Sequence, residues 1–321
     1  MGELSEAEPG LLRVFSYNVR YFAQALWGLA STNAAERAIA ERLAALEPVP
    51  DVICLQEIET NTLRARIAAR HPRRAATQLV GFNAELARAF AARGEPSPYR
   101  AAYFPISEKR LWSFSLAAEG LAVLINERRL HVEPPGPDEL APFRAAVARL
   151  GPELGARICV HVRVRAQGLP LHVFNTHLSL PEPLALTLLP LLPHRLGRAE
   201  NQQREAHALA AFVRERAGAE PFVVCGDFNS RPGTPTLRFL TGEAGFRSAH
   251  AEQGAGERGW ETFSVLGVRM QLDHLFFGGG VRWVDLEGTT SVDSRVGMFA
   301  GLSDPIIGRL RCPPRAGAGP G

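Results

Sequence analysis

The sequence predicts an α/β protein of the α+β type, in which two packed β-sheets carry helices on their outer faces. Three observations predict this fold. Short β-type runs alternate with helical runs, strand-rich segments are spread over the whole length, and no internal repeat or linker divides the chain. The 321 residues are long for one compact domain, but a large sandwich of this kind accommodates them.

Strands are expected where short runs of apolar and β-branched residues end at turn or polar residues. These runs lie at 11–19, 51–57, 120–126, 156–166, 169–178, 221–229 and 305–311. Gln167 and Gly168 predict the turn of a hairpin between the fourth and fifth runs. The stretches MQLDHLFFGG (270–279) and VRWVDLEG (281–288) predict a second hairpin near the end of the chain.

Helices are expected where Ala, Leu, Glu and Arg recur with apolar residues at helical spacing. These segments lie at 34–47, 62–71, 84–93, 137–150 and 199–217. The segment 137–150 also has a proline at its start and acidic residues in its first turn, which is typical of helices. Residues 1–10 and 312–321 are expected to be disordered, so that one domain spans 11–311.

The composition is typical of a soluble globular protein, with 46% hydrophobic residues, 21% charged residues and a net charge of +3. This small charge is no evidence for a nucleic-acid partner. The polar, acidic start of the chain does not resemble a secretory signal, and no apolar run approaches the length of a transmembrane segment. We therefore expect a cytoplasmic monomer. The cysteines lack the spacing of a disulfide framework or a zinc cluster, and they are Cys54, Cys159, Cys225 and Cys312.

Polar side chains recur where the predicted strands end. Taken singly, a strand-end Asn or Asp is usually a turn former, and a lone His usually has an ordinary structural partner. Strand ends of a sandwich converge on one edge, however, and the loops at that edge carry function. The residues in this position are Asn18, Glu57, His177, Asp227, Asn229, Asp273 and Asp304.

This set of side chains suits the hydrolysis of a phosphate ester. Carboxylate and amide oxygens are hard ligands, which Mg²⁺ or Mn²⁺ prefers and Zn²⁺ does not. A phosphoryl transition state needs positive charge and hydrogen-bond donors around its oxygens, and a base that orients water. His, Asn, Arg and a metal ion supply the charge and the donors, and Asp supplies the base.

Five short motifs occur in order along the chain: SYNVR (16–20), LQE (55–57), NTHL (175–178), GDFNSRPGTP (226–235) and LDHLFF (272–277). In this order they resemble the endonuclease/exonuclease/phosphatase superfamily over about residues 11 to 311. The resemblance implies a four-layered α/β/β/α sandwich of two mixed β-sheets flanked by helices, and a metal-dependent phosphoric ester hydrolase. The NTHL motif is similar to the deoxyribonuclease and neutral sphingomyelinase branches.

The resemblance also implies ligands for a metal ion and for phosphate. Glu57 is the expected main ligand of Mg²⁺ or Mn²⁺, with Asn18 on the metal or the phosphate and Asp304 assisting the metal. Asn175 and Arg231 are expected to contact the phosphate or the rest of the substrate.

Four further residues receive catalytic roles from the resemblance. His177 is expected to donate to the phosphate oxygens, and Asp227 to orient or deprotonate the attacking water. Asn229 is expected to hold water or phosphate. Asp273 ordinarily orients a second histidine, which in the family follows the counterpart of Asp304 in a Ser-Asp-His-x-Pro motif.

That second histidine is missing here, because Ser303 and Asp304 are followed directly by Pro305. Either Pro305 replaces the histidine, or two residues are deleted; we favour the deletion, because PIIGRL then matches the family's last strand. His274 is expected to face away from Asp273, since neighbours on a strand point to opposite faces. His250 is expected on a solvated loop. A catalytically impaired protein that binds metal or a phosphorylated ligand is therefore the alternative to an active enzyme.

Two segments bear on the substrate. Residues 179–198 are rich in Leu and Pro, and they form either an apolar loop that meets lipid or, as we prefer, a proline-broken segment packed on the fold. Lys109, Arg110 and Trp112 are expected on a loop before a strand, where they either contact a phosphodiester or belong to an ordinary surface. Nucleic acid, a lipid headgroup and a small phosphorylated molecule all stay open as substrates.

Overall fold

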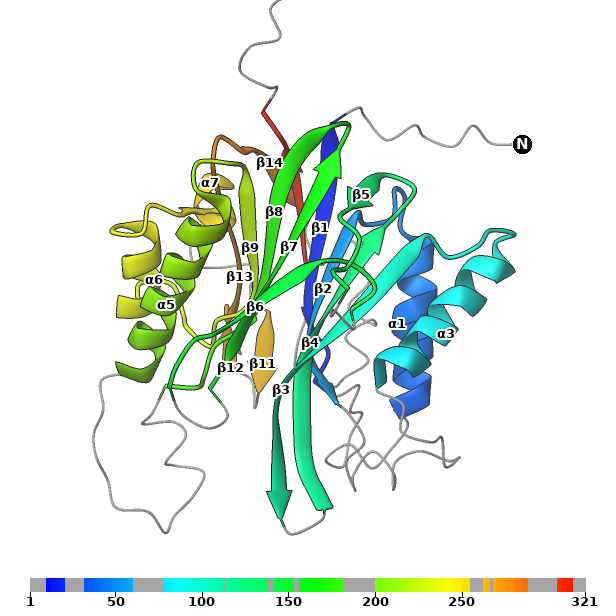
Figure 1. Ribbon diagram of the computed structural model, residues 1–321, viewed down its shortest axis with the longest axis horizontal. Coiled ribbons are helices and arrows are strands. Elements are labelled where there is room, and N and C mark those ends of the chain that lie inside the picture. The colour runs from blue at the N-terminus through cyan, green and yellow to red at the C-terminus, as the bar shows by residue number, and fades with distance from the viewer. Residues whose placement is uncertain are drawn as a thin grey trace, which may run out of the picture.

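In the computed structural model two β-sheets pack face to face, with helices on both outer sides (Figure 1). This arrangement confirms the predicted sandwich. The structure describes residues 10–20, 32–59, 78–111, 114–137, 141–152, 156–181, 200–254, 262–265, 268–287 and 305–313.

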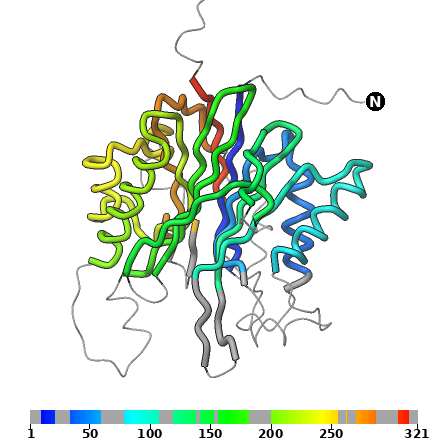
Figure 2. The backbone as a smooth tube through the Cα atoms, viewed as in Figure 1, coloured from blue at the N-terminus to red at the C-terminus, as the bar shows by residue number. Residues whose placement is uncertain are grey.

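The first sheet has the order β14-β15-β1-β2-β4-β3. Its strands are β1 (Leu11–Asn18), β2 (Val52–Glu59), β3 (Tyr99–Leu111), β4 (Phe114–Asn126), β14 (Arg282–Glu287) and β15 (Ile306–Arg311). Strands β1 and β2 are parallel and the other neighbours are antiparallel, so the sheet is mixed. Figure 2 shows the first and last strands of the fold, β1 in blue and β15 in red, side by side.

The second sheet has the order β10-β13-β9-β8-β7-β5, and β6 also pairs with β7. Its strands are β5 (Leu130–Val132), β6 (Ala145–Arg149), β7 (Ile158–Ala166), β8 (Leu169–His177), β9 (Phe222–Asp227), β10 (Arg247–Ser248) and β13 (Asp273–Gly278). Only β8 and β9 are a parallel pair among these neighbours. A separate two-stranded ribbon joins β11 (Phe263–Val265) to β12 (Val268–Met270).

Helices cover the outer face of each sheet. Helices α1 (Thr32–Ala45) and α3 (Gln78–Ala92) cover the first sheet, and α5 (Glu200–Ala217) and α6 (Pro235–Thr241) cover the second. A short helix, α7 (Ala249–Glu252), follows β10. Within the part of the chain that the structure describes, no helix combines the length and the apolar character needed to cross a bilayer.

The alternation of side chains along the strands creates the layers. On β8, Val173 packs between the two sheets, whereas Phe174 packs under α5. On β2, Cys54 faces the space between the sheets and Ile53 faces α1 and α3. Because successive side chains of a strand point to opposite faces, each central strand contributes to two cores.

The predicted helix at 137–150 is wrong over the part that the structure describes. Residues 145–149 form strand β6, which pairs antiparallel with the edge of β7, from Ala145 opposite Val162 to Arg149 opposite Ile158. Alanine has the highest intrinsic helix propensity, but such propensities are small, and pairing with an open sheet edge overrides them here.

The predicted hairpin between 270–279 and 281–288 is also wrong. Strand β13 pairs with β9 in the second sheet, whereas β14 pairs with β15 in the first. Gly279 and Gly280, with φ of +62° and +79°, turn the chain between the sheets. A Cβ at Gly279 would lie 2.0 Å from the Glu220 carbonyl oxygen, so only glycine fits there.

The expected loop with Lys109 and Arg110 is instead the end of β3, whose pairing with β4 extends to Leu111 opposite Phe114. Trp112 lies outside the described residues, as do the predicted helix at 62–71 and most of 179–198. The four cysteines are free.

Candidate functional site

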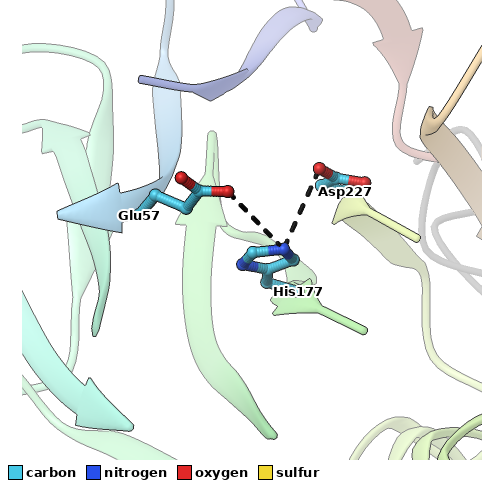
Figure 3. A group of neighbouring side chains, drawn as sticks. All are labelled: Glu57, His177 and Asp227. Atoms are coloured by element: carbon cyan, nitrogen blue, oxygen red, sulfur yellow. Dashed lines mark ion pairs between the residues drawn. The ribbon is translucent and has the colours of Figure 1, made fainter. Parts of the chain in front are cut away.

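The site lies where two pairs of parallel strands end. Asn18 is the last residue of β1 and pairs in register with Gln56 on β2, one residue before Glu57. His177 is the last residue of β8 and pairs with Asp227, the last residue of β9. Parallel strands bring their carboxyl ends to the same edge, and Figure 3 shows Glu57, His177 and Asp227 pointing toward one another from three strands.

Asn18 joins the two carboxylates of this group. Its Nδ2 donates to Glu57 Oε1 at 2.8 Å and to Asp227 Oδ2 at 2.9 Å. His177 Nε2 lies 3.9 Å from each of the same two oxygens. One ligand atom each from Glu57, His177 and Asp227 lies within 4.8 Å of the others, a spacing that a single metal ion could bridge.

The backbone is unusual at the same place. Glu57 has φ of +56° at a register irregularity between β2 and β4, and Asn229 has φ of +48°. Non-glycine residues rarely adopt this region, and such strain concentrates at functional sites. Gly226 precedes Asp227, and a Cβ there would lie 1.9 Å from the Thr176 carbonyl oxygen. The glycine of the GDFN motif therefore allows β9 to run close to β8.

Asn229 contacts both Asp227 and His177, the two catalytic candidates beside it. Its backbone N–H donates to Asp227 Oδ1 at 2.8 Å, and its side-chain Nδ2 donates to the Leu178 carbonyl at 2.8 Å. The same Nδ2 lies 3.1 Å from His177 Nε2. These contacts bring together His177, Asp227 and Asn229, as the sequence predicts.

An ion pair beside His177 was not predicted from the sequence. Arg157 Nη1 lies 3.4 Å from His177 Nδ1, and the same atom pairs with Glu119 Oε1. Both ring nitrogens of His177 thus face donor groups, which disfavours a second ring proton. Burial lowers the pKa of His177 well below its usual value, and the charges of Arg157 and Arg20 lower it further. The sequence signals for these residues were weak: Glu119 directly precedes the predicted strand at 120–126, and Arg157 is the second residue of the predicted strand at 156–166.

The carboxylates at the site are poorly solvated. Burial raises the pKa of Glu57 to about 7 and raises the pKa of Asp227, against the lowering effect of the Asn18 hydrogen bonds. Burial raises the pKa of Asp273 well above its usual value, and the charge of Asp227 adds to this. Several desolvated carboxylates at one edge are stabilised by a cation, so the donor set fits a hard divalent ion.

Asp273 opens β13 directly opposite Asp227. Its backbone N–H donates to Thr262 Oγ1 at 3.0 Å, and its buried Oδ1 has no hydrogen-bond partner among the described residues. His274 is directed away, as predicted: its Nε2 lies 2.7 Å from the Ser230 carbonyl and its ring stacks on Phe276.

Two expectations need correction. Asn175 does not face the site; it lies fully buried between the sheets, where Nδ2 donates to the carbonyls of Leu55 and Ala122 and Oδ1 accepts from Gln56. These bonds occupy its amide, so Asn175 ties the two sheets together instead of binding phosphate. His250 is not on a solvated loop; it is buried on α7, with its ring 5.7 Å from that of His274.

Two predicted residues remain, Arg231 and Asp304. Arg231 is exposed in the loop after β9, and its role in substrate binding stays a prediction. Asp304 and the preceding Ser303 lie outside the described residues, so the predicted contribution of Asp304 to the metal site stays a prediction as well.

Comparison with known proteins decides the family. The sequence model described as the Endonuclease/Exonuclease/phosphatase family matches residues 15–291. The chain belongs to this family. No curated protein sequence matches the chain. The family contains metal-dependent phosphoesterases, and the Glu57, His177 and Asp227 group agrees with that chemistry.

Several solved structures share the fold at low sequence identity. The human Nocturnin catalytic domain with bound sulfate is 16% identical, with 95% of this chain and 94% of that chain covered and a TM-score of 0.59. A humanized D. rerio TDP2 is 14% identical, with 94% and 99% covered and a TM-score of 0.58. A family protein from Bacteroides thetaiotaomicron is 14% identical, with 96% and 100% covered and a TM-score of 0.61. These similarities establish the fold alone.

Proposed function

We propose that this protein is a divalent-metal-dependent phosphoesterase that hydrolyses a phosphodiester. One observation carries the proposal: a Glu, a His and an Asp from three strand ends bring ligand atoms within 4.8 Å of one another, and the amide of Asn18 bridges the two carboxylates. Such a group at the edge of this family's sandwich matches what phosphoryl transfer requires.

Mg²⁺ or Mn²⁺ is the proposed cofactor, because Glu57 and Asp227 of this group are carboxylates in a poorly solvated place and Asn18 adds an amide oxygen. Glu57 would be its main ligand, with Asn18 and Asp304 as further ligands. When bound, the ion supplies positive charge that stabilises the oxygens of the phosphoryl transition state.

The side chains around the ion have separate tasks in this proposal. Asp227 is held through both oxygens, by Asn18 Nδ2 and by the Asn229 N–H, and this fixed carboxylate orients the attacking water. His177 and Asn229 contact the phosphate oxygens. Arg157, paired with Glu119, lies against His177 Nδ1 and fixes the orientation of its ring.

A catalytically impaired protein of the same fold, which binds metal or a phosphorylated ligand, is the second candidate. It is favoured by the sequence Ser303-Asp304-Pro305, which lacks the family's second histidine, and by the buried Oδ1 of Asp273 that has no partner among the described residues. Insertion of His-x between Asp304 and Pro305 tests this candidate. A gain in phosphodiesterase rate supports the deletion, and no gain in a folded, metal-binding variant argues against it.

The proposed substrates are nucleic acid, a lipid headgroup or a small phosphorylated molecule. The sulfate in the Nocturnin catalytic domain occupies a protein of the same fold, and sulfate resembles phosphate in shape and charge. The NTHL motif favours the deoxyribonuclease and neutral sphingomyelinase branch. We also propose that the protein is cytoplasmic and monomeric.

Hydrolysis of bis(p-nitrophenyl) phosphate with Mg²⁺ or Mn²⁺ tests the function directly. The wild-type chain is compared with Glu57→Gln and with the surface control Glu41→Gln. Metal-dependent turnover that is lost only in Glu57→Gln supports the proposal. Absence of turnover in a wild-type protein that binds the metal supports the impaired alternative.

A further inference from the structure

The first turn of α5 contacts the backbone that follows β8 and β9. Gln202, the third residue of this helix, is only 2% exposed. Its Nε2 donates to the carbonyl oxygens of Ser179 at 2.7 Å, Asn229 at 3.0 Å and Phe228 at 3.3 Å. One side-chain amide therefore contacts the loop after His177 and the loop after Asp227.

The other end of the same amide extends the connection. Gln202 Oε1 accepts from Ser230 Oγ at 2.9 Å, and the Ser230 carbonyl lies 2.7 Å from His274 Nε2. His274 follows Asp273 on β13, so the network reaches a third strand end of the site. Glu205, one turn further along α5, accepts from Ser179 N–H at 2.8 Å and from Ser179 Oγ at 2.6 Å.

The backbone that Gln202 holds controls the reacting groups. The Asn229 N–H bonds to Asp227 Oδ1, and the Asn229 side chain lies 3.1 Å from His177 Nε2. A shift of the Asn229 backbone would therefore move Asp227, Asn229 and His177 relative to one another. Misplacement by about 1 Å costs roughly 10²-fold in rate when groups must be aligned for reaction.

We propose that Gln202 is a positioning residue, which fixes the His177 loop and the Asp227–Asn229 loop in register through its side-chain amide. The inference rests on the proposed function for its kinetic consequence, but the geometry it predicts is independent of turnover. Gln202 touches no reacting atom; it acts through the two loops.

The test replaces Gln202 with Met, which has the same length and no donor. Val213→Ala, on the same helix and 1% exposed, is the matched control for loss of helix packing. For Gln202→Met we expect kcat on bis(p-nitrophenyl) phosphate to fall about 10²-fold, with KM changed less than about threefold, and we expect Val213→Ala to keep wild-type kcat. Wild-type kcat in folded Gln202→Met, or an equal loss in both variants, would overturn the proposal.

A readout without turnover separates this inference from the proposed function. The ring resonances of His177 and the side-chain amide resonances of Asn229 are measured by NMR in the wild type and in each variant. Both sets should shift in Gln202→Met and stay in place in Val213→Ala. Unshifted resonances overturn the positioning role even if the wild type hydrolyses nothing. If Gln202→Met does not fold, Ser230→Ala, which removes one bond to Gln202, should shift the Asn229 resonances, and unshifted resonances there overturn the proposal.

Discussion

Asp227 and Asp273 lie directly opposite each other in the antiparallel register of β9 and β13. Both side chains are buried, at 3% and 2% exposure. Burial raises the pKa of each carboxyl, and the charge of Asp227 raises the pKa of Asp273 further. Two buried carboxylates in this arrangement are stable only when protons, hydrogen bonds or a cation compensate their charge. This relationship is the physical reason why a divalent ion suits this edge of the sandwich.

Replacement of Glu57 by Gln should abolish tight binding of Mn²⁺ and Mg²⁺. The substitution removes a charge from the carboxylate group but keeps an oxygen that can accept the 2.8 Å hydrogen bond from Asn18. Isothermal titration calorimetry should show at least about a 10²-fold loss of affinity, comparable to the larger effects of altering a metal site. Glu41→Gln on the exposed side of α1 should bind as the wild type does. Unchanged affinity in Glu57→Gln would remove Glu57 as a ligand.

Replacement of His177 by Ala should lower kcat/KM by about 10²–10³, the usual cost of losing one donor to a transition-state oxyanion. The rate is measured on bis(p-nitrophenyl) phosphate with Mn²⁺, beside the thermal unfolding midpoint. The exposed His131→Ala is the control, and it should keep both the rate and the midpoint. Full activity in a folded His177→Ala variant would show that His177 does not donate to the phosphate oxygens.

Replacement of Asn175 by Ala should destabilise the fold by about 2–3 kcal/mol, because it leaves the buried carbonyls of Leu55 and Ala122 without their donor. Urea unfolding measures this loss. Metal affinity should stay at the wild-type value, since Asn175 does not face the site. Wild-type stability combined with lost phosphate or substrate binding would restore the role that the sequence suggested.

The stability of the protein should fall as the pH drops below about 6.5, with His161 as one cause. Burial lowers the pKa of His161 to about 3, and the charges of His172, Arg216 and Arg163 contribute. Between about pH 3 and pH 6.5, His161 binds a proton in the unfolded chain but not in the folded chain, so acid favours unfolding.

His161→Phe isolates this contribution. By linkage, the wild type should lose about 1 kcal/mol more than the variant between pH 7.5 and pH 5.5. Urea unfolding at both pH values measures the difference, with exposed His131→Gln as the control. Equal losses in the wild type and His161→Phe would show that His161 does not bind this extra proton on unfolding.

Local composition and motif order were enough to predict the family, most of the strand ends and most of the candidate site. Short apolar runs indicate the strands, and the polar residues at their ends occur in a recognisable order, so the sequence alone predicts Glu57, His177, Asp227 and Asn229 as candidate site residues. Their convergence was also expected from the sequence, because the strand ends of a sandwich meet at one edge and the loops at that edge carry function.

How deeply a side chain lies between the two sheets, in contrast, depends on the tertiary structure. Asn175 and His177 are two residues apart on the same face of β8, about 6–7 Å along the strand. The shorter distance to the edge makes His177 part of the site, whereas Asn175 lies between the sheets and bonds to Leu55 and Ala122. The order of residues along one strand does not indicate how far the opposite sheet covers that strand.

Pairing partners depend on the tertiary structure as well. The alanine-rich residues 145–149 became an edge strand on β7, and β13 and β14 joined different sheets although they are adjacent in the chain. The contacts of Arg157 and Gln202 with the site also join residues from separate elements. These outcomes depend on hydrogen bonds between segments that are distant in the sequence, and the spacing of residues within one segment does not encode them. The chemical character of the strand ends, in contrast, follows directly from the residue types found there.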